Sequence, residues 1–130
     1  MEREIENSIN MVIIYLSDIG ISVDISKDAK ESFCDLFLYK ITIPEYNESD
    51  LILYSLLHET GHFMLDAEGL DITDNPDSID VLVNEVLAWD RGMEIADTLK
   101  LKKSYFNDDE YWIFAKDNLI KYTAFFNLKL

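Results

Sequence analysis

The amino-acid sequence predicts an α+β protein that is mostly helical and forms a single domain over residues 1–130. Several long segments repeat apolar residues at three- and four-residue steps, which is the period of an amphipathic helix. Two short segments before Pro44 are instead rich in β-branched and aromatic residues, which favours a short β-sheet or hairpin. The chain has 130 residues, 48% of them hydrophobic, which is enough for one buried core.

The first half of the chain is expected to contain a helix and two strands. Residues 1–19 carry a helical apolar stripe that Gly20 ends. Residues 21–25 alternate apolar and polar side chains, as a short strand does. Phe33 to Ile43 is expected to be one further strand that ends at Pro44 and pairs with the strand before it.

Three more helices are expected in the rest of the chain. A second helix, capped by Asn47 or Ser49, should reach about Asp66, where a loop over residues 66–77 begins. The two remaining helices are expected over residues 79–102 and 109–127. The resulting order is an N-terminal helix, a small sheet, and then three helices in succession.

Charge excludes several classes of function. The chain has 11 basic and 26 acidic residues, so its net charge is −15, and a protein that neutralises nucleic-acid phosphates needs the opposite balance.

Its one cysteine, Cys34, cannot form an internal disulfide or a cysteine-rich zinc site. No apolar run approaches the ~20 residues of a membrane span, and the acidic N-terminus does not resemble a secretory signal. We therefore expect a cytoplasmic protein that binds neither nucleic acid nor a membrane.

Both histidines of the chain lie in one short motif, His58-Glu59-Thr60-Gly61-His62. Residues four apart on a helix lie on the same face, so the two imidazoles can reach one metal ion. Glu59 follows the first histidine and can turn its carboxylate toward a metal-bound water. This is the H-E-x-x-H arrangement of zinc peptidases, with the carboxylate as general base.

A catalytic zinc usually takes three protein ligands, and the sequence offers only a carboxylate as the third. Glu85 is the candidate that geometry favours. It belongs to a helix stripe whose other members are Val81 and three very small residues, Ala88, Gly92 and Ala96. Such a stripe allows a close approach to Gly61 in the motif, and this would bring Glu85 to the histidines.

Other readings of these residues remain open. The histidines could be ordinary polar groups that are hydrogen-bonded to nearby acids, or the motif could survive in an inactive site. Asp66 or Asp90 could hold the free N–H of a ligand histidine. An oxyanion donor is also expected, and the sequence does not choose among its tyrosines; the candidates considered are Tyr54, Tyr105, Tyr111 and Tyr122.

The motif followed by Asn84-Glu85-x-x-Ala88 resembles a gluzincin-type zincin, and the order of elements is similar to that of small ImmA/IrrE-like metallopeptidases. The resemblance covers roughly residues 30–100. It implies a minimal zincin-like core in which His58, His62 and Glu85 bind Zn²⁺ and Glu59 is the catalytic residue. It also implies an edge strand that lines the cleft before the motif helix, a part that residues 36–43 could play.

The sequence therefore predicts a zinc-dependent peptidase that cleaves a specific protein or peptide substrate. The acidic stretch from Asp66 to Asp80 would favour a basic substrate. The aromatic C-terminal helix could form a homodimer through Trp112, Phe126 and Leu128. The alternative is an acidic protein without catalysis, either a nucleic-acid mimic that inhibits a DNA-binding partner or a zincin-derived interaction module.

Overall fold

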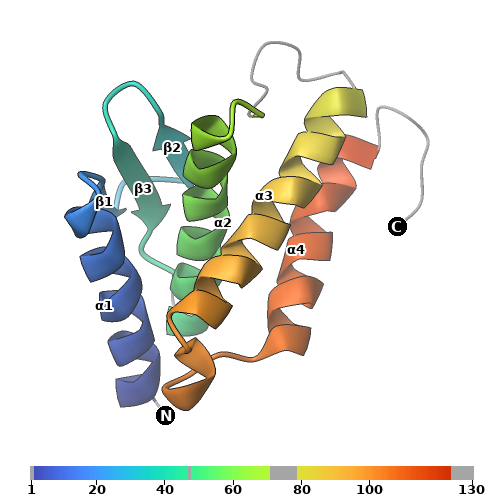
Figure 1. Cartoon of the computed structure of the whole chain (residues 1–130). Helices are drawn as coiled ribbons and strands as arrows, with labels where there is room; N and C mark the ends of the chain where they lie inside the picture. Colours follow the sequence, from blue (N-terminus) through green and yellow to red (C-terminus); the bar gives the residue numbers. More distant parts are fainter. Residues whose placement is uncertain (1, 47, 71–78, 124–130) are drawn as a thin grey trace.

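The structure is a computed structural model, and it describes residues 2–46, 48–70 and 79–123. Within these ranges it is an α+β fold of mostly helical content, as the sequence predicts. The elements are α1 (Glu2–Asp18), β1 (Ser22–Ser26), β2 (Phe33–Asp35), β3 (Lys40–Pro44), α2 (Ser49–Ala67), α3 (Ile79–Thr98), the 3-10 turn η1 (Leu101–Lys103) and α4 (Asp108–Thr123). Helix α2 runs through the middle, with α1 and the sheet on one side and α3 and α4 on the other (Figure 1).

The N-terminal helix forms where the apolar spacing predicts it. Its inward face buries Ile5, Ile9, Val12 and Leu16. The helix ends in a turn in which the N–H of Ile21 donates to the carbonyl of Leu16. Gly20 lies in this turn at φ 86°, a left-handed conformation that favours glycine. The predicted helix end at Gly20 is therefore confirmed.

The segment from Phe33 to Ile43 is not one strand, as predicted, but an antiparallel hairpin of β2 and β3. The Asp35 carboxylate accepts hydrogen bonds from the backbone N–H groups of Phe37 and Leu38. Tyr39 then adopts φ 53° and turns the chain back. The strand is broken because the side chain of an aspartate caps the turn that follows it. Strand propensity alone does not predict such a turn.

The central strand of the sheet is β3. It pairs in parallel with β1 and antiparallel with β2, so the predicted pairing of the two strand segments is confirmed. Its residues Ile41 to Pro44 are all buried, whereas β1 and β2 keep partly exposed side chains. The strand order β1-β3-β2 makes β1 and β2 the edge strands, and no other strand of the described residues pairs with the outer edge of β2.

Helix α2 carries the H-E-x-x-H motif and is buried around most of its circumference, from Ile52 to Gly61 without interruption. A helix that is apolar on nearly all sides belongs in a core rather than on a surface. Its N-cap is Glu48, which makes no side-chain capping bond, and Ser49 is the first helical residue rather than the cap. Asn47, the other predicted cap, lies outside the described residues.

Two glycines let α2 and α3 pack backbone to backbone. A Cβ atom added at Gly61 would lie 1.9 Å from the carbonyl oxygen of Ala88, and one added at Gly92 would lie 2.6 Å from that of Leu57. Both distances are far inside van der Waals contact, so neither position has room for a side chain. The close approach that the stripe of small residues predicts is confirmed.

We expect Gly61→Ala to destabilise the protein by about 3 kcal/mol, because the added methyl group forces the two helices apart. A glycine-to-alanine substitution in an exposed helix normally stabilises the protein instead, since alanine is the better helix former by about 1 kcal/mol. Urea unfolding followed by circular dichroism measures the difference. Asp66→Ala, an exposed change near the end of the same helix, is the control and should be close to neutral. A Gly61→Ala protein as stable as the wild type would contradict the close packing.

The last two helices differ from their predicted ranges mainly at the ends. Helix α3 stops at Thr98 because Lys100 adopts φ 56°, and the residues predicted as its last turn form η1 instead. Helix α4 begins within one residue of the expected start. Residues 71–78, which form most of the predicted acidic loop, and residues 124–130 lie outside the described part of the chain.

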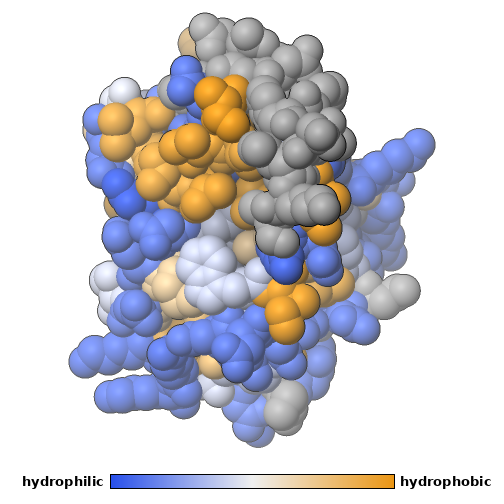
Figure 2. Space-filling view, turned by 90° about the vertical axis from the view of Figure 1, so that its right-hand side faces the viewer, coloured by the Kyte–Doolittle hydropathy of each residue, from blue (hydrophilic) through white to orange (hydrophobic). Residues whose placement is uncertain are grey.

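Apolar side chains gather on the upper part of the face that α3 and α4 form (Figure 2). Exposed apolar residues of these helices are Ile79, Val83, Val86, Trp112, Ile113 and Ile120. Of the three residues predicted to form a dimer contact, Trp112 is exposed, and Phe126 and Leu128 lie outside the described residues. The homodimer stays a prediction. Among the described helices, none is long and apolar enough to cross a membrane.

Candidate metal centre

The two histidines project from successive turns of α2 toward the same side. Their ring centroids are 4.8 Å apart. One possible ligand atom from each of His58, Glu59 and His62 lies within 4.8 Å of the others, so this group is close enough to hold a metal ion. The predicted convergence of the two imidazoles is therefore confirmed, and the helical period of α2 accounts for it.

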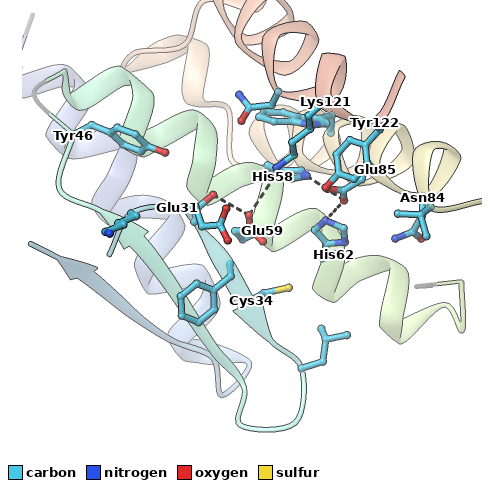
Figure 3. A pocket seen from close by; sticks show the side chains of 17 residues that line it. Glu31, Cys34, Tyr46, His58, Glu59, His62, Asn84, Glu85, Lys121 and Tyr122 are labelled. Atoms are coloured by element: carbon cyan, nitrogen blue, oxygen red, sulfur yellow. Dashed lines mark hydrogen bonds and ion pairs between the residues drawn. The ribbon is translucent and has the colours of Figure 1, made fainter. Parts of the chain in front are cut away.

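Glu85 reaches this group from α3. Its Oε2 atom lies 2.5 Å from His62 Nε2 and 3.6 Å from His58 Nε2 (Figure 3). The packing of Gly61 against Ala88 brings the two helices close enough for this contact. The three side chains named as ligands by the sequence thus lie close together, with Glu85 Oε2 near both Nε2 atoms.

Glu59 lies on the other side of the His58 ring. Its Oε2 atom is 3.3 Å from His58 Nδ1 and accepts a hydrogen bond of 3.1 Å from the Ser32 hydroxyl. Both glutamates are therefore candidates for a third ligand: Glu59 lies within 4.8 Å of ligand atoms of both histidines, and Glu85 contacts both Nε2 atoms.

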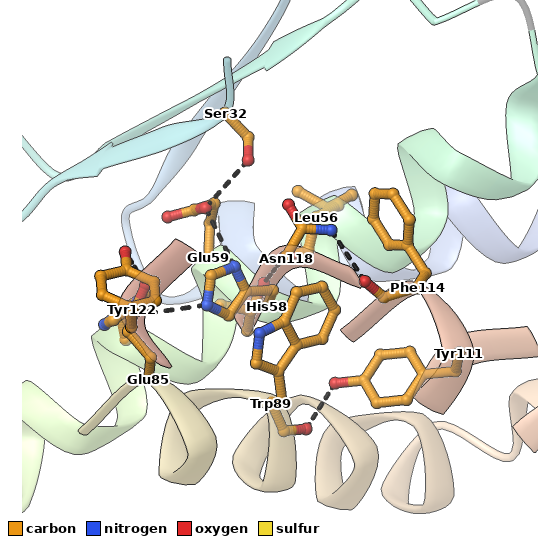
Figure 4. A network of polar contacts seen from close by, with 12 residues as sticks. Ser32, Leu56, His58, Glu59, Glu85, Trp89, Tyr111, Phe114, Asn118 and Tyr122 are labelled. Atoms are coloured by element: carbon orange, nitrogen blue, oxygen red, sulfur yellow. Dashed lines mark hydrogen bonds and ion pairs between the residues drawn. The ribbon is translucent and has the colours of Figure 1, made fainter. Parts of the chain in front are cut away.

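His58 is held by its surroundings and yet lacks a hydrogen bond at one nitrogen. Its ring stacks on the Trp89 indole, with centroids 4.1 Å apart and planes 5° apart (Figure 4). Its Nε2 atom is buried and has no hydrogen-bond partner among the described residues. A buried polar atom without a partner is costly, and a bound cation would satisfy it. The residues present therefore fit a metal.

The charges of the cluster shift its pKa values. Burial by itself would raise the pKa of Glu85 and of Glu59, but the neighbouring histidines hold both pKa values below the usual range. Burial would lower the pKa of His58, and its contacts with the two glutamates outweigh this and raise it. Both carboxylates are therefore ionised at neutral pH, as metal ligands and general bases must be.

A tyrosine completes the cluster from α4. The Tyr122 hydroxyl donates a hydrogen bond of 2.8 Å to Glu85 Oε1. Burial and the adjacent carboxylate raise the pKa of Tyr122, which keeps the phenol protonated and able to donate. The other candidate tyrosines are engaged elsewhere: Tyr54 and Tyr105 donate to Glu110, and Tyr111 donates to the Trp89 carbonyl.

The cluster opens into a pocket of about 530 Å³ (Figure 3). One wall is the segment from Lys30 to Cys34 together with Leu36, and the other walls come from Tyr46, α2, α3 and α4. The strand at the pocket is thus the edge strand β2, not the predicted segment 36–43, which consists of a turn and the central strand. Both signs of charge line it, since Lys30 and Lys121 accompany the glutamates, and the expected preference for basic substrates stays a prediction.

Several predicted or overlooked residues can now be placed. Asp66 and Asp90 are exposed and do not line the pocket, and Asp90 contacts Arg91 instead. Trp89 was not singled out by the sequence, although its position one turn after Glu85 offered a signal. Tyr122 continues the buried face of α4, which comprises Tyr111, Ala115 and Leu119. Nothing in the sequence pattern pointed to Ser32.

No protein-family model matches the chain, and neither the curated proteins nor the solved structures contain a significant match. The resemblance to zincins therefore depends on the motif and on the geometry of the cluster, and membership of that family stays a prediction.

Proposed function

We propose that this protein is a zinc-dependent peptidase whose zinc ligands are His58, His62 and Glu85 and whose general base is Glu59. The observation that carries the proposal is the position of Glu85 Oε2 beside both imidazole Nε2 atoms, at 2.5 and 3.6 Å. A second helix thus supplies a carboxylate at the corner where the H-E-x-x-H motif needs a third ligand. This agrees with the resemblance to gluzincin-type enzymes.

Zinc is the metal that this donor set favours. Two imidazoles and one carboxylate form a catalytic set that leaves a position open for water or substrate. Magnesium and calcium prefer sites made wholly of oxygen atoms, which the histidines do not provide. The stacking of His58 on Trp89 fixes one ligand before the metal arrives, which reduces the entropy lost on binding.

The chain's own residues then carry out the proton transfers. When bound, zinc supplies electrophilic polarisation of the substrate carbonyl and acidifies the attacking water. Glu59 takes the proton of that water and passes it to the leaving amine. Its Oε2 atom is engaged by Ser32 and His58, so Oε1 is the oxygen that exchanges the proton.

The substrate is an extended peptide that lies along β2. This strand borders the pocket, and in the part of the chain that the structure describes its outer edge has no partner strand, so a peptide can pair with it through backbone hydrogen bonds. Backbone pairing would hold the scissile bond across the cluster, while the side chains at the pocket select the sequence. Phe33 and Leu36 provide apolar contact on this wall.

The test is hydrolysis of a peptide library made by digesting a whole proteome, with the products identified by mass spectrometry. We expect cleavage by the purified protein with zinc, loss of cleavage with a chelator, and recovery when zinc is restored. Cleavage that persists in the chelator, or a zinc-loaded protein that hydrolyses no peptide, would exclude the proposed function.

A further inference from the structure

Two hydroxyl groups contact the two carboxylates of the cluster from opposite sides. Tyr122, on α4, donates to Glu85, and Ser32, in the loop before β2, donates to Glu59. The contacts form a continuous chain that runs from Ser32 through Glu59, His58 and Glu85 to Tyr122 (Figure 4). Neither hydroxyl belongs to the motif or to the set of candidate ligands.

We propose that these hydroxyls give the two carboxylates different roles: Tyr122 positions Glu85 as a metal ligand, and Ser32 positions Glu59 as the base. The inference rests on the proposed function and names the residues that assign each glutamate its role. Both are positioning residues, since each acts through a glutamate rather than on the substrate.

The oxygen atoms used in each contact support this division. Tyr122 binds Oε1 of Glu85, and the histidines lie near Oε2. The phenol therefore holds the carboxylate at the oxygen that the metal does not need, and it orients Oε2 toward the two Nε2 atoms. A hydrogen bond to a ligating carboxylate typically contributes 10–100-fold to metal affinity.

Glu59, on the other side of His58, is also held through one of its carboxylate oxygens. The Ser32 hydroxyl and His58 Nδ1 both contact Oε2 of Glu59. These contacts hold Glu59 Oε2 at His58 Nδ1, while Glu85 Oε2 lies nearest His58 Nε2, so each carboxylate is held at a different nitrogen of the ring. The hydroxyl also keeps the carboxylate at the pocket, where Ser32 and Glu59 are both lining residues.

The experiment compares Tyr122→Phe and Ser32→Ala in two assays. Zinc affinity is measured by competition with a chromogenic chelator, and the visible spectrum of the Co²⁺ form reports ligand geometry. Peptide cleavage at saturating zinc gives kcat and KM. Matched controls are Tyr105→Phe, which removes a tyrosine–glutamate hydrogen bond of 2.9 Å elsewhere, and Ser104→Ala, which removes a serine hydrogen bond to the Glu4 carbonyl.

We expect opposite results for the two variants. Tyr122→Phe should weaken zinc binding about 10- to 100-fold and alter the Co²⁺ spectrum. Ser32→Ala should bind zinc normally and lose about tenfold in kcat, the fold-change that corresponds to one lost hydrogen bond to a charged group. Neither control should change zinc affinity, spectrum or kcat.

Other outcomes would overturn the inference in distinct ways. Normal zinc affinity with a reduced kcat in Tyr122→Phe would mean that the phenol acts on the substrate. Weakened zinc binding in Ser32→Ala would mean that Glu59 is a ligand. A wild-type protein that binds no zinc would overturn both the inference and the proposed function. Zinc binding that depends on Tyr122, in a protein that cleaves no peptide, would exclude the peptidase and the role given to Ser32, and it would support the role given to Tyr122.

Discussion

Glu59→Gln should abolish peptide cleavage and leave zinc bound. Glutamine keeps the size of the side chain and can still contact Ser32, but its amide cannot accept the proton of the attacking water. General-base catalysis typically contributes about 100- to 10,000-fold, so we expect a loss in kcat of that size with little change in KM. The measurement is steady-state hydrolysis of a peptide selected from the library, together with zinc content by mass spectrometry.

Glu94→Gln is the matched control for this substitution, because Glu94 is an exposed acid on α3 outside the pocket. It removes the same negative charge and should keep full activity. If Glu59→Gln retains wild-type kcat, Glu59 is not the base. If it loses zinc, Glu59 is a ligand, in agreement with its short distances to the two histidines.

Glu85→Gln, His58→Ala and His62→Ala should each lose zinc. Removal of a direct ligand should weaken binding by more than about 100-fold, since loss of a group that only hydrogen-bonds a ligand already costs 10–100-fold. Titration of the wild type should give one zinc per chain. At free zinc about 1,000 times Kd, binding adds about 4 kcal/mol to the stability of the wild type, and this increment should vanish in the variants.

Asp90→Asn is the control for the third ligand. Asp90 lies on the same helix and was considered as a holder of a ligand histidine's free N–H, but its carboxylate contacts Arg91 at the surface. Its substitution should leave both zinc content and the zinc-dependent rise in Tm unchanged. A Glu85→Gln protein that keeps one tightly bound zinc would remove Glu85 from the ligand set.

The centre of the site could be predicted because it depends on local geometry and on one packing rule. The spacing of His58 and His62 places them on one helix face whatever surrounds the helix. The small residues around Ala88 and Gly92 indicate that another backbone comes close, and the glycine within the motif indicates where. Together these positions predicted that Glu85 would reach the histidines, and it does so at 2.5 Å from His62.

The strand region shows where such reasoning fails. Phe33 to Ile43 has strand propensity throughout, and the sequence predicted a single strand. The turn depends on hydrogen bonds from Phe37 and Leu38 to the carboxylate of Asp35 and on the left-handed conformation of Tyr39. Because propensity averages over neighbours, it misses one side chain that caps its own turn. This error also misplaced the strand that borders the pocket.

The sequence by itself determined which side chains can meet within one helix and which helix faces can approach closely, because both follow from the 3.6-residue period and from side-chain size. It did not determine that Tyr122 would contact Glu85 or that Ser32 would contact Glu59. These pairs are separated by 37 and 27 residues and lie on different elements. Only the tertiary structure decides such contacts, since they depend on how α4 and the loop before β2 pack against the shared core.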